Sequence, residues 1–160
     1  MRNIFLTLSA LWVIGLFSCR KDSEKSFSDT PQITYKGISN SRINFFDTGV
    51  ACNITLEFTD GDGNIGRKED SVITIQDFRS DTLYKSYQYP FPIIGSEFRD
   101  HKWLEGTVRI TLNTVFFTPR LDSLHLAEKK DTLYFKIYLK DEAGNRSNTV
   151  QTATIYMHGD

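Results

Sequence analysis

The chain has 160 residues and a nearly balanced charge, with 19 basic side chains, 20 acidic side chains and a formal net charge of −1. This balance gives no electrostatic reason to expect a nucleic-acid partner, and the length suits one domain with a core better than two. The sequence has no G-x-S-x-G, P-loop or G-x-G-x-x-G signature, so we expect no enzyme.

The N-terminus has the pattern of an exported precursor. One positive charge at Arg2 is followed by an apolar run over 4–17, which is shorter than the roughly 20 residues that span a bilayer. The end of this run, Leu16-Phe17-Ser18-Cys19, resembles a bacterial lipobox. We therefore predict a signal peptide over 1–18 and a lipid anchor on Cys19. An ordinary secretory signal or an uncleaved anchor is the alternative.

A polar, charged stretch follows, and we interpret 19–30 as a flexible tether. Its Lys21-Asp22-Ser23-Glu24 segment resembles the export signal of Bacteroidetes lipoproteins that lie on the outer face of the outer membrane. We expect an outer-membrane, cell-surface protein held by its lipid. The sequence does not distinguish a periplasmic from an outward-facing position.

The remainder, 31–160, is expected to be one all-β domain. Period-two alternation and β-forming residues predict strands at 33–35, 42–46, 50–58, 72–78, 82–89, 107–113, 132–140 and 148–157. A loop is expected over 94–105, and an irregular or short helical segment over 121–130. Seven or eight short strands separated by turn signals indicate an immunoglobulin-like or fibronectin-like antiparallel β-sandwich. Cys52 falls on the apolar face of strand 50–58, so we predict a buried, unreactive thiol.

A cluster of oxygen-bearing residues follows strand 50–58. Asp60, Asp62 and Asn64 alternate with glycines, which allows a tight turn around one centre, and calcium prefers six to eight oxygen ligands. The glycine positions and the lack of a glutamate at the twelfth place argue against an EF-hand. The same residues are also typical of a plain turn, so calcium binding and a metal-free turn both stay open.

Topology adds two further candidate ligands. If strands 50–58, 72–78, 132–140 and 148–157 are strands B, C, F and G of the sandwich, the B–C and F–G loops lie at one end. Asp141, in the F–G turn, could then join the calcium site, as could Asp70 in the B–C loop.

Two segments resemble known proteins. Residues 58–66, Phe-Thr-Asp-Gly-Asp-Gly-Asn-Ile-Gly, are similar to the F-T-D-G-D-G-D-I-G signature of small Bacteroidetes lipoproteins, with Asn64 replacing an aspartate. Residues 141–148, Asp-Glu-Ala-Gly-Asn-Arg-Ser-Asn, resemble their D-x-A-G-N-x-S-N turn. The resemblance implies an immunoglobulin-like lipoprotein and no particular activity.

Aromatic side chains suggest a second functional class. Tyr84, Tyr87, Tyr89 and Trp103 could stack on sugar rings of a glycan, or they could simply pack at the edge of the sandwich. Arg79, Lys85 and Arg99 beside them are expected to be solvated charges. We expect a non-catalytic binding or assembly module, with a glycan-binding accessory lipoprotein as the alternative. The protein or glycan partner, the bound ligand and the oligomeric state are not specified by the sequence.

Overall fold

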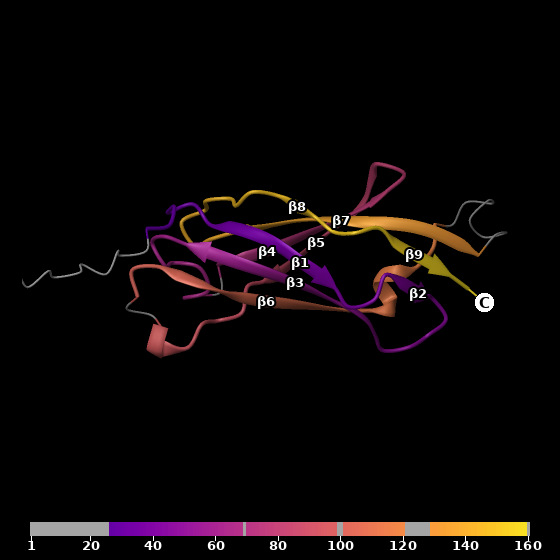
Figure 1. Cartoon of the computed structure of the whole chain (residues 1–160), viewed down its shortest axis with the longest axis horizontal. Helices are drawn as coiled ribbons and strands as arrows, with labels where there is room; N and C mark the ends of the chain where they lie inside the picture. Colours follow the sequence, from indigo (N-terminus) through magenta and orange to yellow (C-terminus); the bar gives the residue numbers. More distant parts are fainter. Residues whose placement is uncertain (1–25, 69, 99–100, 121–128, 160) are drawn as a thin grey trace, which may run out of the picture.

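The computed structural model describes residues 26–68, 70–98, 101–120 and 129–159, and these residues form two packed β-sheets (Figure 1). The predicted signal peptide, Cys19 and most of the predicted tether lie outside the described residues, as does Arg99. The strands are β1 (Gln32–Ile38), β2 (Arg42–Asn44), β3 (Val50–Asp60), β4 (Val72–Arg79), β5 (Thr82–Pro90), β6 (Leu104–Asn113), β7 (Lys130–Lys140), β8 (Val150–Gln151) and β9 (Ile155–His158).

The strand order is that of a fibronectin-like sandwich. One sheet has the order β1-β3-β6, and the other has the order β2-β9-β7-β4-β5, with β8 also paired to β7. Every pairing is antiparallel except the short one between β2 and β9. The predicted all-β, immunoglobulin-like sandwich is confirmed, and β3, β4 and β7 occupy the positions of strands B, C and F.

Alternating apolar residues build the core between the sheets. In β3, Cys52, Ile54, Leu56 and Phe58 are buried, and in β7 the buried apolar residues are Leu133, Phe135, Ile137 and Leu139. Because side chains on a strand alternate between its two faces, each sheet presents one apolar face to the other. Burial raises the pKa of the Cys52 thiol to about 11, so the thiol stays protonated and packs as an apolar group, as predicted.

The C-terminal strand differs from expectation. The sequence predicted one strand over 148–157, but the described chain forms β8, leaves the sheet at 152–154 and returns as β9. Thr152 explains the break, because its backbone amide donates to the Phe135 carbonyl while its hydroxyl accepts from the Phe135 amide.

The only helices among the described residues are the short 3₁₀ turns η1 (Ser96–Phe98) and η2 (Thr114–Phe117), so none is long and apolar enough to cross a membrane.

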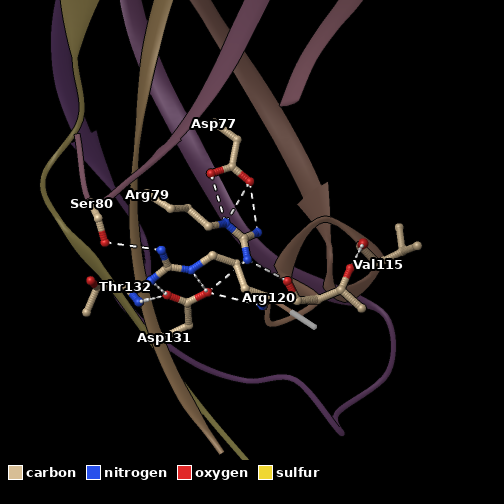
Figure 2. Close-up of polar contacts among 8 residues, drawn as sticks. Asp77, Arg79, Ser80, Val115, Arg120, Asp131 and Thr132 are labelled. Atoms are coloured by element: carbon tan, nitrogen blue, oxygen red, sulfur yellow. Dashed lines mark hydrogen bonds and ion pairs between the residues drawn. The ribbon is translucent and has the colours of Figure 1, made fainter. Parts of the chain in front are cut away.

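A buried ion network lies at one end of the sandwich (Figure 2). Asp77 and Arg79 are two residues apart in β4, so both point inward, and the Arg79 guanidinium lies 2.8 Å from Asp77 and 3.0 Å from Asp131 of β7. Arg120 holds the other oxygen of Asp131 at 2.9 Å. The prediction that Arg79 is solvated is therefore wrong: its side chain is 2 % exposed.

Two further contacts complete this network. Arg79 donates to the Thr118 carbonyl at 2.7 Å, and its guanidinium carbon lies 4.2 Å from the centre of the Tyr84 ring. Burial is the largest single influence on both carboxylates, and it raises the pKa of Asp77. For Asp131, hydrogen bonds from Arg120 and from the Thr132 amide together outweigh burial and hold its pKa below its usual range. Arg79 therefore neutralises a carboxylate that water does not reach.

Candidate metal centre

The end opposite the ion network brings the two acidic loops together. β3 ends at Asp60, and the register of β4 against β7 pairs Val72 with Lys140, so the loop after β3 and the turn after β7 are neighbours. Carboxylate oxygens of Asp60, Asp62 and Asp141 lie within 4.8 Å of one another. The predicted meeting of the B–C loop and the F–G turn is thus observed at the left end of Figure 1.

Asp60 is the buried centre of this cluster. Its relative exposure is 0 %, and its Oδ2 atom accepts a 2.9 Å hydrogen bond from the Ile65 amide. Its Oδ1 atom is buried and has no hydrogen-bond partner. The pKa of Asp60 is raised to about 6, chiefly by burial and also by the charges of Asp62 and Asp141, while the Ile65 amide opposes the rise. A buried carboxylate oxygen without a partner is costly, and either a proton or a bound cation would offset that cost.

Asn64 contributes a second unpaired oxygen. Its Nδ2 atom donates to Asp62 Oδ2 at 2.6 Å, which fixes the orientation of the amide. The Asn64 Oδ1 atom is buried and has no hydrogen-bond partner. The side chain therefore holds Asp62 with its nitrogen and leaves a neutral oxygen free.

Asp141 is oriented by its own turn. The carboxylate is buried and accepts two hydrogen bonds from Asn145, one from the backbone amide at 2.7 Å and one from Nδ2 at 2.9 Å. Sequence reasoning did not assign a role to Asn145. The available signal was its place four residues after Asp141, where Asp and Asn side chains commonly bond to turn backbone. The B–C loop is also joined to this turn, because the Lys68 amide donates to the Glu142 carboxylate.

Glycines let the B–C loop touch other segments closely. The Gly61 amide donates to the Ser28 carbonyl at 2.8 Å, and a Cβ atom at Gly61 would lie 2.6 Å from that oxygen. Gly66 has a φ of +69°, and a Cβ atom there would lie 2.7 Å from the Pro92 carbonyl.

Phe27 packs edge-on against Trp103 at 5.4 Å. The chain therefore contacts the sandwich from Phe27 onward, within the segment that was expected to be tether.

The fifth predicted ligand, Asp70, does not join the cluster. The hydroxyl of the neighbouring Ser71 is buried and accepts the Gly66 amide at 2.9 Å, so Ser71 points inward. Asp70 is an exposed residue of the turn before β4, and it is not one of the three residues whose oxygens lie within 4.8 Å of one another.

The four aromatic residues considered for glycan binding have different environments. Trp103 lies against Phe27 at the metal end, whereas Tyr84 covers Arg79 at the other end. Tyr87 and Tyr89 pair with Ile75 and Ile73 of β4, and both pack edge-on against Phe116. Burial raises the pKa of both phenols. Tyr87 and Tyr89 therefore contribute to the edge of the core.

The donor set consists only of oxygens. Among the described residues, Asp60, Asp62 and Asp141 are the only group of three or more acidic, histidine or cysteine side chains placed to hold one ion. Carboxylate and amide oxygens suit hard cations such as calcium, magnesium or manganese, whereas zinc and copper sites usually include nitrogen or sulfur ligands. The arrangement is a possible acidic metal site for a hard divalent cation.

Comparisons with known proteins add only a distant likeness of fold. No protein-family profile matches the sequence, and no curated protein matches it. One similar solved structure is the CARDB domain of a Pyrococcus furiosus protein, crystallised in complex with di-metal ions. The alignment covers 84 % of this chain and 100 % of that chain, at 12 % identity and a TM-score of 0.29.

Proposed function

We propose that the protein is a membrane-anchored, non-catalytic binding or assembly module, and that a calcium ion stabilises the B–C end of its sandwich. The observation that carries the proposal is the buried, unpaired Asp60 Oδ1 atom beside two further carboxylates. Three carboxylates this close repel one another unless protons or a cation compensate them. A bound cation compensates them without protonating Asp60.

The residues present fit such an ion. Asp60, Asp62 and Asp141 would supply charged oxygens, and the unpaired Asn64 Oδ1 would supply a neutral one. Calcium tolerates variable geometry and high coordination numbers, whereas magnesium requires near-ideal octahedral geometry and retains several waters. The ligand atoms of this site come from two separate turns, an arrangement that suits calcium better than magnesium.

A calcium titration of the full chain in mild detergent tests this proposal. Isothermal calorimetry should detect one site for calcium and weaker binding of magnesium. Asp60→Asn keeps the shape of the side chain but removes its charge, so it should abolish calcium binding. Asp47→Asn removes the same charge from an exposed residue of the β2–β3 loop and serves as the matched control. Equal binding by both variants would show that the cluster is a metal-free turn.

The membrane anchor is proposed from the Leu16-Phe17-Ser18-Cys19 segment. One acyl chain binds a membrane marginally, and stable anchoring needs two or more signals, which a diacylated and N-acylated cysteine would provide. Fractionation of cells that produce the wild type should place the protein with outer membranes. Cys19→Ser should leave it in the soluble fraction, and retention of that variant in membranes would point to an uncleaved anchor.

A further inference from the structure

A second polar surface lies on the outer face of the larger sheet. In β7, Lys136, Tyr138 and Lys140 alternate with the buried Ile137 and Leu139, so these three side chains point away from the core. Arg146, after the turn that follows β7, pairs with Lys140 through an isolated antiparallel β-bridge of the backbone. Its side chain therefore adds a fourth member to the same row.

Aromatic rings fix two of these cations in place. The Lys136 ammonium lies 4.4 Å from the centre of the Phe78 ring, and Phe78 stacks on Tyr134 with a centroid distance of 5.5 Å. The Arg146 guanidinium carbon lies 3.6 Å above the Tyr138 ring. Cation–π contacts of this kind restrict a flexible side chain without neutralising its charge.

Within the described part of the chain, no carboxylate lies at ion-pair distance from these cations, although Asp81, in the turn after β4, accepts a 3.0 Å hydrogen bond from the Tyr134 hydroxyl. β4, β5, β7 and β8 are described in full and contain only two acidic residues, Asp77 and Asp131, which point inward and pair with Arg79. Among the described residues, none of Lys136, Lys140 and Arg146 forms an ion pair. By contrast, Lys36 on the smaller sheet lies 3.2 Å from Glu57.

Neutral hydrogen-bonding side chains flank the row on the same face. Lys136 is opposite Gln76 of β4 and Gln151 of β8, and Gln76 is in turn opposite Ser86 of β5. Amide and hydroxyl groups both donate and accept hydrogen bonds. The surface therefore combines positioned cations with neighbouring amide and hydroxyl groups that can form hydrogen bonds with the hydroxyls of a ligand.

We propose that this outer face of β4, β7 and β8 binds an extended anionic polysaccharide. Lys136 and Arg146 would hold carboxylate or sulfate groups of the polymer, and Gln76 and Gln151 would bond to its hydroxyls. From Lys136 to Lys140 the row extends about 14 Å at roughly 3.4 Å per residue, which favours a ligand whose charges recur along a chain.

The sheet pairing disfavours a peptide ligand here. An extended peptide is usually recognised by adding a strand to an exposed sheet edge. β7 is paired with β4 on one side and with β8 and β9 on the other, so its backbone groups are already used. The row shares no side chain with the aromatic set Tyr84, Tyr87, Tyr89 and Trp103 or with the metal ligands, although Arg146 directly follows the turn that Asn145 and Asp141 form.

Binding of defined polymers to the full chain in mild detergent tests this inference. The probes are polygalacturonate, which carries carboxylates, and chondroitin sulfate, which also carries sulfates; neutral dextran and poly-glutamate are the comparison polymers. Calcium-free buffer prevents metal bridging to the polymers. At least one of the two anionic polysaccharides should bind, dextran should not, and salt should weaken the binding. The double variant Lys136→Gln with Arg146→Gln should bind about tenfold or more weakly, because two charge-assisted contacts are lost.

A matched double variant removes the same charge elsewhere. Lys36→Gln with Arg109→Gln changes two cations on the smaller sheet and should leave affinity within about twofold, because screening at physiological salt limits exposed charges to roughly 8 Å. Three results would overturn the proposal: no binding of either anionic polysaccharide, an equal loss in both double variants, or equal or tighter binding of poly-glutamate. The last result would identify the face as a site for acidic polypeptides.

Discussion

Replacing Arg79 with methionine should strongly destabilise the fold, because it leaves the Asp77 carboxylate buried and alone. Among the described residues, every hydrogen bond to this carboxylate comes from Arg79, at 2.8 to 3.2 Å, and Asp77 is 0 % exposed. Asp131 keeps Arg120 as its partner at 2.9 Å. Removing one partner of a buried ion pair costs about 3–5 kcal/mol, so Arg79→Met should lower the free energy of unfolding by that amount at pH 7.

Acidity should reduce this loss. Burial already raises the pKa of Asp77, and Arg79 is the strongest opposing influence, so the variant should raise that pKa further. A carboxylate whose folded-state pKa is raised contributes stability at low pH and loses it as the pH rises through that pKa. The difference between wild type and Arg79→Met should therefore be greatest at neutral pH and shrink toward pH 4. Urea unfolding followed by circular dichroism at several pH values measures it.

Two further variants make this prediction refutable. Asp77→Leu with Arg79→Met removes both charges and should recover most of the lost stability, because apolar replacements of a buried ion pair are often neutral or stabilising. Lys36→Met breaks an exposed pair, with side chains 47 % and 53 % exposed, and should cost less than about 1 kcal/mol. If Arg79→Met costs no more than Lys36→Met, or if the double variant is as unstable as the single one, the network does not have the role described.

The metal end gives two further predictions. The pKa of Asp60 is raised from 3.8 to about 6, so in calcium-free buffer the fold should lose roughly 3 kcal/mol of stability as the pH rises from 4 to 7. Asp60→Asn should lack that part of the pH dependence. Urea unfolding of both proteins across this pH range measures the difference. Gly66→Ala should destabilise the fold by about 1 kcal/mol or more, measured by thermal unfolding, because φ is +69° and the added Cβ would approach the Pro92 carbonyl. Gly144→Ala, where φ is +89° but the nearest atom is 3.6 Å away, should cost less.

Local patterns predicted much of the fold. Alternation in 50–58 and 132–140 predicts two central strands and the burial of Cys52, and the B–C and F–G labels predict that Asp60 lies near Asp141. These features follow from period-two geometry and sandwich topology, both of which are visible in a sequence.

Long-range pairing explains what the sequence did not reveal. Arg79 was expected to be solvated because its partner Asp131 lies 52 residues away, although its spacing from Asp77 placed the two on one face. Asp70 was assigned to the metal site by proximity in sequence, but it is exposed, whereas its neighbour Ser71 is buried and accepts the Gly66 amide. The row on β7 depends on Arg146 stacking on Tyr138 across a turn, which no spacing rule indicates.

Thermal unfolding of the full chain in detergent, with saturating calcium and with chelator at pH 7, tests the central claim most directly. Calcium at one hundred times its dissociation constant would add about 2.7 kcal/mol, which should raise the midpoint by roughly 5–10 °C. The account predicts this shift for the wild type and Asp47→Asn and its loss in Asp60→Asn and Asp141→Asn. No shift in the wild type, or an equal shift in all four proteins, would contradict a calcium site at Asp60, Asp62 and Asp141.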